Sequence, residues 1–561
     1  MWYFTDLSRF KKEREDLERL SASADWLTPI RWRSDDAMRL IFDVEITVGT
    51  RTFAVALTFP AHFPFTPLSV YPRDDNSRWS SHQFGPGGEL CLEYGPDNWT
   101  PDRTGVEVLE SAHRLLLTEN PPTGNPGIVA SRHETTLGQE LRGKNLRFLI
   151  TRELKTFLQE MDVGTKLKGN LLVLFRESII YIVDKITKSD GEVWHNAAVP
   201  TTLGKETYEW SVYVVRIPAG ADFPSAADLA TFNTGLERLG IVNDGTSLVL
   251  VRDDEVRGFF VPKDTVTELV TVLPPAEVRR LDEGHDKLRT LRVAIIGCGS
   301  LGSKIATMLA RSGVCRFFLA DDDVLLNDNL VRQDLDWRDV GTHKVDALAR
   351  RLRNVNPDAK VTVRRLRIAG QESSGSAETA IESLAKRDLI IDATANPDVF
   401  NFLAGFVDSV RKPVIWAEVF GGGFGGSIAR CRPGIEPSLQ MMRRAIENWF
   451  GDRDYTPARV TRNYETGGDG IPLIADDADV TSIAAPAARL AIDTLLGREP
   501  SHFPHAAYVI GLGPEEKLFS QAFETFPVDL GDAPAAAEKP KLSPEETAAE
   551  FAEVIKIFEN K

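Results

Sequence analysis

A glycine-rich turn after an apolar run carries the clearest chemistry in the sequence. Val293 to Ile296 is apolar enough for a buried parallel strand, and Gly297, Gly299 and Gly302 follow it with the spacing G-x-G-x-x-G. Glycines at this spacing let the backbone approach a phosphate where a helix begins, and the free N–H groups of that helix favour negative charge. The motif therefore predicts a nucleotide-binding turn between a strand and a helix.

Acidic side chains stand at the end of the next predicted strand. Cys315 to Ala320 is apolar, and Asp321, Asp322 and Asp323 come directly after it. An acidic residue at this place commonly holds a ribose hydroxyl, so Asp321 or Asp323 is the candidate ribose ligand. Taken alone, these features are typical of NAD-dependent oxidoreductases.

Two cations farther along the chain change that interpretation. The letters N-D-N-L-V-R-Q follow the acidic residues, and G-T-H-K then opens another predicted helix. A dehydrogenase has little use for an Arg and a Lys there, whereas both bring positive charge to triphosphate oxygens. The stretch from about 291 to 430 resembles the adenylation domain of ubiquitin-activating enzymes and the bacterial ThiF/MoeB family. On its N-L-x-R-Q motif and its helix-opening lysine fall Asn329, Arg332, Gln333 and Lys344.

The resemblance implies ATP and Mg²⁺ as cofactors, with catalytic roles for Arg332, Lys344 and Asp392. Relatives carry D-C-T-D-N at the end of a buried strand, and their second Asp is tied to magnesium. Here the corresponding letters are D-A-T-A-N, with Ala395 in place of that Asp. Because magnesium prefers oxygen ligands, either Asp392 or Asp398 is expected to carry it, or adenylation is weakened.

Cys91 is the candidate nucleophile in the N-terminal part of the chain. Residue chemistry alone favours a small buried side chain, because Leu90 and Leu92 flank it. Its surroundings run from a helix through a strand meander and a proline-rich loop to G-x-L-C-L, W-T-P and an apolar helix ending in N-P-P. That order resembles a ubiquitin-conjugating (UBC-fold) domain, which implies that Cys91 forms a thioester. A thiolate suits this role because it is nucleophilic near neutral pH.

Two departures from these relatives leave alternatives open. Their His-Pro-Asn tripeptide is replaced by S-H-Q-F, in which His82 keeps a structural place, so Gln83, Asn98 or Asp97 would have to support the oxyanion. The loop from about 464 to 480, where relatives carry a second thioester cysteine, contains none. We favour direct transfer of the adenylate to Cys91 over the alternative of a hydroxyl nucleophile from Thr466, Thr481 or Ser482.

The remaining cysteines indicate packing rather than metal binding. No C-x-x-C pair follows Cys431, so we expect no structural zinc. Cys298 and Cys315 fall in the glycine turn and on a predicted strand. Four cysteines in 561 residues also argue against a disulfide framework and for a reducing cytoplasm.

Length and pattern predict an α/β multidomain protein. Residues 1–135 are expected to form an α+β UBC-like domain, and 136–285 a mixed α/β region that is a linker, an adaptor or an inactive adenylation-like half. Residues 286–526 are expected to form a Rossmann-like ThiF/MoeB adenylation domain, and 527–561 a flexible tail with a terminal helix. No apolar run is long enough for a membrane span, and a formal net charge of −16 disfavours nucleic acid as the main partner.

The order of the two halves resembles fused activating and conjugating proteins of bacterial operons, including the CD-NTase-associated fusion of CBASS operons and related ubiquitin-like operons. It implies activation of the C-terminal carboxylate of a ubiquitin-like or CD-NTase-like partner, transfer to Cys91, and conjugation to a target amine in antiphage defence. The alternative is a non-catalytic scaffold that retains ATP and partner binding. Relatives also imply a homodimer in which Arg279 or Arg280 reaches the ATP of the other subunit.

Overall fold

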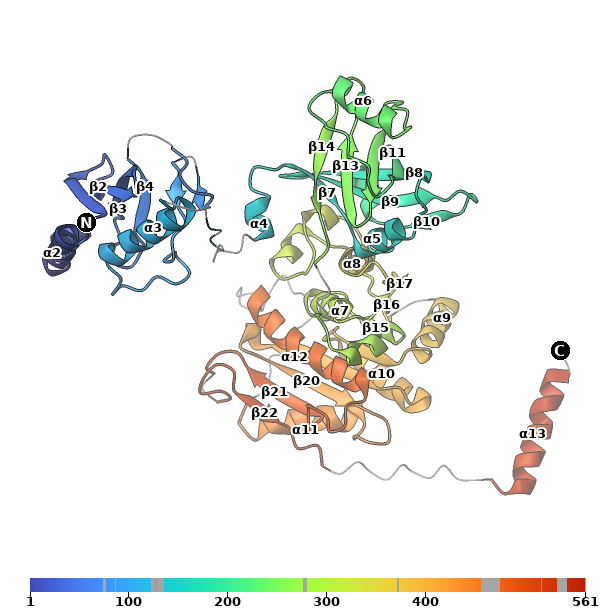
Figure 1. Cartoon of the computed structure of the whole chain (residues 1–561). Coiled ribbons are helices and arrows are strands. Elements are labelled where there is room, and N and C mark those ends of the chain that lie inside the picture. Colours follow the sequence, from blue (N-terminus) through green and yellow to red (C-terminus); the bar gives the residue numbers. More distant parts are fainter. Residues whose placement is uncertain are drawn as a thin grey trace. The chain divides into compact units, whose positions relative to one another are not determined.

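The computed structural model (Figure 1) describes residues 1–73, 77–85, 87–122, 127, 129, 136–275, 280–370, 373–455, 475–515, 517–531 and 542–559. Contacts along the backbone divide the chain into two compact units, Met1–Gly143 and Lys144–Lys561. The finer division into four segments stays a prediction.

The N-terminal unit is an antiparallel meander packed against helices α2 and α3. Its sheet has the order β1-β2-β3-β4, and α2 and α3 bury Leu17 and Leu109 in the same apolar cluster as Val44 and Val55. The elements are α1 Trp2–Thr5, α2 Leu7–Ser23, β1 Leu27–Ser34, β2 Leu40–Val48, β3 Arg51–Phe59, β4 Ser69–Pro72, β5 Gln83–Phe84, β6 Glu89–Leu90, α3 Gly105–Glu119 and α4 Leu137–Glu140. The expected order of a helix followed by a strand meander is present.

Strand β1 is the element of this sheet that sequence patterning missed. Its residues L-T-P-I-R-W-R-S do not alternate, and Pro29 lies beside a register shift in the pairing with β2. Proline is tolerated there because β1 is an edge strand. An edge strand with mostly exposed side chains leaves little hydrophobic signal in the sequence.

The middle of the chain is a closed sheet. Its strands follow the order β10-β9-β7-β14-β13-β12-β11-β8, and an additional β9–β8 pairing closes the ring. Helices α5 and α6 pack on opposite sides of β11 and β12, since they join separate apolar clusters. The elements are β7 Leu146–Leu149, α5 Arg152–Gln159, β8 Lys166–Phe175, β9 Ile179–Thr187, β10 Val193–His195, β11 Tyr208–Arg216, α6 Leu229–Arg238, β12 Ser247–Arg252, β13 Glu255–Phe260 and β14 Thr267–Val272.

The C-terminal part is a twisted sheet between two layers of helices, as Figure 1 shows. The order is β17-β16-β15-β18-β19-β20-β21-β22, and the first five strands are parallel. This is the strand order expected of a Rossmann-like domain. The strands are β15 Arg292–Ile296, β16 Arg316–Ala320, β17 Lys360–Arg364, β18 Leu389–Asp392, β19 Val414–Phe420, β20 Gly425–Cys431, β21 Ala507–Gly511 and β22 Thr525–Pro527.

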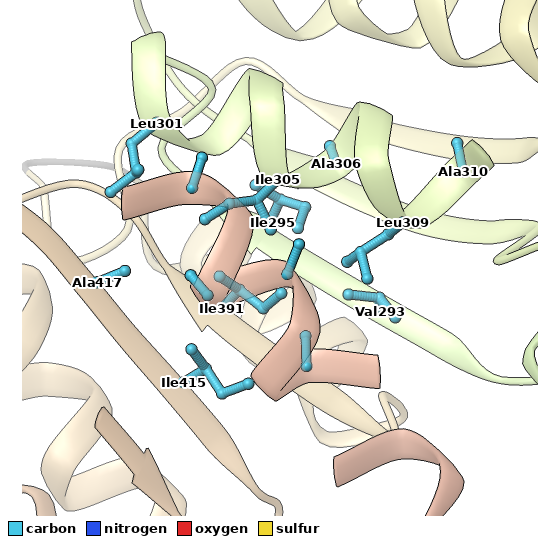
Figure 2. Close-up of a cluster of buried hydrophobic side chains, with 14 of the residues drawn as sticks. Val293, Ile295, Leu301, Ile305, Ala306, Leu309, Ala310, Ile391, Ile415 and Ala417 are labelled. Atoms are coloured by element: carbon cyan, nitrogen blue, oxygen red, sulfur yellow. The ribbon is translucent and has the colours of Figure 1, made fainter. Parts of the chain in front are cut away.

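Alternate residues of each strand face different helix layers. Val293 and Ile295 of β15 lie against Ile305 and Leu309 of α7 in Figure 2, whereas Ala294 and its neighbours on the other face join the cluster around α10. One layer contains α7 Ser300–Arg311, α8 Lys344–Val355 and α12 Asp477–Leu496, and the other contains α9 Ser374–Ala385, α10 Pro397–Val410 and α11 Leu439–Gly451. Burial on both faces explains why these strands read as continuous apolar runs.

The terminal helix expected in the tail is present, and a longer helix, α12, precedes it. Helix α12 begins at Asp477, because Asp476 caps it through the backbone N–H of Asp479. The terminal helix α13, Pro544–Glu559, is exposed along its described side chains, including Phe551 and Phe558.

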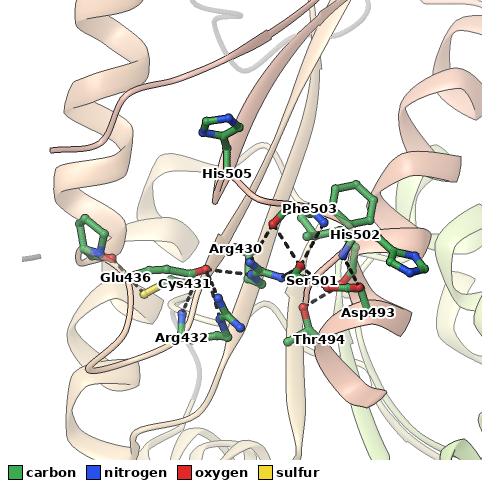
Figure 3. Close-up of polar contacts among 12 residues, drawn as sticks. Arg430, Cys431, Arg432, Glu436, Asp493, Thr494, Ser501, His502, Phe503 and His505 are labelled. Carbon is green, nitrogen blue, oxygen red and sulfur yellow. Dashed lines mark hydrogen bonds and ion pairs between the residues drawn. The ribbon is translucent and has the colours of Figure 1, made fainter. Parts of the chain in front are cut away.

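A buried polar network ties α12 to β20. Arg430 is 2% exposed, and its guanidinium pairs with Glu436 at 2.9 Å and with Asp493 of α12 at 3.3 Å. Ser501 donates to Asp493 at 2.6 Å, and the Phe503 carbonyl accepts from Arg430 at 3.3 Å (Figure 3). Such a network is stable only when each buried charge keeps its partners.

Arg430→Ala should therefore lower the local stability of β20 and α12 by about 3–5 kcal/mol, because two carboxylates lose their buried cation. Amide hydrogen exchange of the two elements measures the change. The matched control is Lys188→Ala, which removes an exposed pair with Glu192 and should change local stability by less than about 0.5 kcal/mol. Equal exchange in the two variants would contradict this role for Arg430.

Candidate functional site

A cavity of about 1300 Å³ opens at the carboxyl ends of the parallel strands. Gly297 follows β15, Asp321 follows β16 and Ala393 follows β18, and all three line it. Glu418 near the end of β19 lines it as well. Ligands of open α/β sheets bind at this edge because the strand order reverses there. The structure thus gathers most of the predicted site residues in one place.

The glycine turn is shaped by two close approaches of the backbone. Gly297 has a φ of +83°, and a Cβ on Gly302 would lie 1.9 Å from the Gly297 carbonyl oxygen. A Cβ on Gly299 would instead meet open space. Gly302 therefore lets α7 begin directly at the sheet edge, and Gly299 leaves the cavity clear. Together they form a cradle suited to a phosphate at a helix N-terminus.

Asp321 holds this turn from the neighbouring strand. Its carboxylate accepts from the backbone N–H of Cys298 at 2.7 Å and of Asp323 at 2.8 Å. Burial raises the pKa of the Asp321 carboxyl, although the two backbone N–H groups and Lys344 oppose the shift. Asp323 is more exposed and accepts from Lys344 Nζ at 2.8 Å.

Cations and amides complete this half of the cavity. Lys344 is the first residue of α8, and Arg332, Asn329 and Gln333 line the same wall. Asn329 Oδ1 accepts from the Leu326 N–H at 2.9 Å, which fixes the turn before Arg332. Gln333 donates to the Cys298 carbonyl at 3.5 Å, and its buried Oε1 has no hydrogen-bond partner within the described part of the chain.

Asp392 lies behind the cavity and does not line it. The side chain is 1% exposed, and its Oδ1 accepts from the Thr394 N–H at 3.0 Å and Oγ1 at 2.7 Å. Burial raises the pKa of the Asp392 carboxyl to about 6, against the hydrogen bonds from Thr394. The lining residues are instead Ala393 to Pro397. Direct contact of Asp392 with a metal ion in the cavity does not fit this geometry, and Asp398 does not line the cavity either.

The half of the cavity beyond β18 was not predicted from the sequence. Its walls include the carboxyl end of β19 and one side of α11, which contribute Trp416, Glu418, Phe420, Arg443 and Glu447. The sequence signal is indirect, because the letters of β19 are mostly apolar and α11 follows only at Leu439. Only the polar Glu418 inside the apolar run V-I-W-A-E-V-F marked this segment.

Cys91 follows β6 and is partly exposed. Its backbone N–H donates to the His82 carbonyl at 2.7 Å, which fixes the cysteine beside the S-H-Q-F segment. Burial raises the pKa of the Cys91 thiol above its usual value, and the charges of Asp97 and Glu89 raise it further. A thiol so placed needs a base or a lower local negative charge before it becomes a nucleophile.

Two of the side chains expected to stabilise an oxyanion are already engaged. The Gln83 amide donates to the carbonyls of Ser77 at 3.1 Å and Gly88 at 2.7 Å, so both of its hydrogens are used. Asn98 donates to the Glu93 carbonyl at 2.7 Å and accepts from Gly95 at 2.8 Å, which is a turn. The two hydrogen bonds from the Gln83 amide oppose its expected role as an oxyanion donor, whereas the Asn98 amide donates one hydrogen bond among the described residues and its role stays a prediction.

The other expected residues are dispersed. Thr481 and Ser482 lie inside α12 rather than in a loop, whereas Thr466 and Arg279 lie outside the described residues. Arg280 lines a separate cavity of about 450 Å³ with Arg152 and His285. Cys298 is fully buried, and burial raises the pKa of Cys431 to about 12. Within the described residues, no helix is both long and apolar enough to cross a membrane.

Gly302→Ala should disrupt the glycine turn, because the new Cβ would lie 1.9 Å from a carbonyl oxygen. We expect a lower melting temperature and loss of ATP binding, measured by thermal unfolding and calorimetry. The matched control is Gly299→Ala, where the Cβ meets open space. That variant should keep the melting temperature of the wild type, and equal melting temperatures for all three proteins would refute the assigned packing.

Asp97→Asn should speed alkylation of Cys91 by iodoacetamide at neutral pH. The Asp97 charge raises the thiol pKa, so its removal lowers that pKa and increases the thiolate fraction, by roughly two- to threefold. Alkylation measured across pH should show the whole profile moved to lower pH. Asp102→Asn, another carboxylate of the same loop, is the control, and an unchanged profile for Asp97→Asn would show that its charge does not reach the sulfur.

Comparison with known families agrees with this geometry. Residues 277–502 match the ThiF family model, and residues 170–275 match a model described as a domain observed between E2 and E1 domains. The first match covers the glycine turn, the cations and β19, and the second covers most of the closed sheet.

Individual relatives match over part of their length. The chain is 38% identical to the ATP-dependent ubiquitin transferase-like protein Cap2 of Enterobacter hormaechei over 23% of this chain and 21% of that protein. It is 32% identical to the sulfur carrier protein ThiS adenylyltransferase of Escherichia coli over 27% of this chain and 57% of that protein. A solved structure of E. coli MccB with AMPCPP and MccA is 21% identical, with a TM-score of 0.34 over 45% of this chain and 67% of that one, too low to carry weight. The chain therefore contains a ThiF/MoeB-like adenylation domain, preceded by a domain of the kind found between E2 and E1 domains.

Proposed function

We propose that this protein activates the C-terminal carboxylate of a partner protein with ATP and passes the acyl group to Cys91. The observation that carries the proposal is one cavity in which a phosphate cradle and two cations occupy one half while the other half is left for a second reactant. Its volume of about 1300 Å³ exceeds the roughly 300–1,000 Å³ common for single small ligands. The names of the Cap2 and ThiS relatives support adenylation of a small protein.

The nucleotide half accounts for ATP binding. In this proposal the turn of Gly297, Gly299 and Gly302 holds the phosphates through backbone N–H groups. Arg332 and Lys344 neutralise phosphate oxygens, and Lys344 exchanges Asp323 for a phosphate when the nucleotide enters. Asp323 is then free for the ribose, whereas Asp321 keeps the turn in shape.

Asn329 and Gln333 act on the same loop rather than on the phosphates. Asn329 fixes the backbone before Arg332, and the unpartnered Oε1 of Gln333 offers an acceptor to a donor of the nucleotide or of the partner tail. The role of Asn329 follows from a hydrogen bond already formed in the protein, and that of Gln333 follows from an acceptor that has no partner there.

Asp392 is proposed as a positioning residue. It holds Thr394, and with it the loop 393–397 that lines the cavity. Magnesium bound to ATP would neutralise negative charge at the phosphates. The carboxylate of Asp392 does not fit the role of a direct magnesium ligand. The absence of the second Asp, at Ala395, is the main difference from the family pattern.

The proposed chemistry has three steps. A carboxylate oxygen of the partner bonds to the α-phosphorus, and the bond to the leaving pyrophosphate breaks. The Cys91 thiolate then attacks the acyl carbon, AMP leaves, and the thiol proton passes to solvent or a base. Finally a target amine attacks the thioester, loses a proton and releases Cys91.

The N-terminal unit is proposed to be the conjugating, UBC-like half. Its antiparallel meander, the position of Cys91 after a short strand and the following α3 support that reading. We propose that the partner is a ubiquitin-like or CD-NTase-like protein, that a target protein receives it, and that the setting is bacterial antiphage defence in the cytoplasm. A homodimer in which Arg280 reaches the other subunit's nucleotide belongs to the same proposal.

A scaffold that binds ATP and partner without catalysis is the second candidate. Ala395 and the engaged amide of Gln83 favour it, because each removes a group that the reaction would use. The two candidates differ in pyrophosphate exchange, which a scaffold does not catalyse.

Lys344→Ala should reduce partner-dependent pyrophosphate exchange by roughly a hundredfold or more, because a phosphate charge is left uncompensated. Cys91→Ala should keep exchange at the wild-type rate and lose the thiol-sensitive adduct seen on a non-reducing gel. Cys431→Ala, which alters a buried cysteine, is the control for the adduct. Exchange that survives Lys344→Ala, or an adduct that survives Cys91→Ala, would remove the corresponding role.

A further inference from the structure

Glu418 is a charged group that the proposed chemistry leaves without a task. It lies near the end of β19, where Asp392 of β18 is paired with Trp416, so Glu418 is two residues farther along the strand. Its side chain is partly buried and lines the half of the cavity away from the glycine turn. A carboxylate in such a place is costly unless hydrogen bonds or cations compensate it.

The compensation within the protein is incomplete. Ser427, opposite Glu418 on β20, donates to its Oε1 at 3.2 Å. No salt bridge to Glu418 occurs among the residues that the structure describes. Burial raises the pKa of the Glu418 carboxyl to about 7, which Ser427 and Arg443 oppose and Asp392 and Glu447 reinforce.

Arg443, a cation that lines the same half, is already engaged. Arg443 pairs with Glu447 at 3.3 Å, and its guanidinium stacks over Phe400 at 4.9 Å. Arg443 and Glu447 therefore offset each other, and the charge that remains on this wall is that of Glu418. The wall thus favours a donor or a cation from a ligand.

We infer that Glu418 selects the partner protein by accepting a hydrogen bond from a basic side chain close to its C-terminal carboxylate. The inference rests on the proposed function, in which the carboxylate reaches the phosphates across the nucleotide half. The residues just before the terminus would then lie along β19 and α11. A lysine or arginine there satisfies Glu418, whereas an aspartate or glutamate would meet a like charge in a confined space.

Binding of synthetic peptides to the full-length protein tests this selection. Three pairs of fluorescent peptides with a free C-terminal carboxylate would be used, and the members of each pair would differ only by Lys or Glu at the second, third or fourth position from the end. Anisotropy titrations with saturating AMPCPP give their affinities. We expect the Lys peptides to bind roughly tenfold or more tightly than the Glu peptides at one of these positions.

Glu418→Gln should bring that ratio to within roughly threefold, because the amide keeps the acceptor for Ser427 but loses the charge. AMPCPP affinity should stay unchanged. Glu524→Gln, which alters a carboxylate that accepts from the Ser520 hydroxyl and does not line the cavity, should keep the wild-type ratio. The inference is overturned if wild type shows no preference, if neither peptide binds, or if Glu418→Gln keeps the preference. A changed magnesium requirement for AMPCPP binding in Glu418→Gln would instead make Glu418 a metal ligand, which also overturns it.

Pyrophosphate exchange with the same peptides and ATP separates the two proposals. Glu418-dependent binding without exchange would leave the selection standing and refute carboxylate activation. Exchange that is indifferent to the Lys and Glu peptides would support activation and refute the selection.

Discussion

The close approach of Gly302 to the Gly297 carbonyl is the constraint on which the site depends. A side chain on Gly302 would lie 1.9 Å from that oxygen, so only glycine lets the chain turn from β15 into α7 at the sheet edge. The turn brings Ser300 and Leu301, the first residues of α7, to the wall of the cavity, and the first N–H groups of a helix have no partner within the helix. Asp321 then holds the Cys298 N–H from the neighbouring strand, which makes the glycine turn and the acidic residues one unit. The cations are added to that unit by α8 and the loop before it.

Charge is arranged differently in the two halves of the cavity. In the nucleotide half, Asp323 forms an ion pair with Lys344, and Asp322 forms one with Arg367 at 3.2 Å. Each of these cations is therefore paired with a carboxylate. A phosphate can replace those carboxylates without bringing a bare charge into the cavity. In the other half, the Glu418 carboxylate accepts one hydrogen bond from a hydroxyl group and has room to accept another from a ligand. The first arrangement suits an anion, and the second suits a donor.

Residues around the glycine turn could be selected from the sequence because their signals are local, and the structure gathers most of them in one cavity. Gly297, Gly299 and Gly302 act through backbone geometry, and continuous apolar runs mark strands buried on both faces. Strand β1 could not be predicted from the sequence, because an exposed edge strand shows no alternation of apolar and polar residues. The roles of Asp392, Gln83 and Asn98 depend on which hydrogen bonds their side chains already make. Glu418 lines the cavity because β19 and α11 form one wall of it in the folded protein. No local sequence pattern specifies that arrangement.

The most direct test of the account follows oxygen atoms through the reaction. A peptide or partner protein whose C-terminal carboxylate carries oxygen-18 would be incubated with the full-length protein, ATP and magnesium, and the AMP analysed by mass spectrometry. Attack of the carboxylate on the α-phosphorus predicts that released AMP gains one labelled oxygen once the acyl group has moved on. If the peptide carries the label but the released AMP does not, or if no AMP is released, the claim that this cavity activates a carboxyl terminus is contradicted.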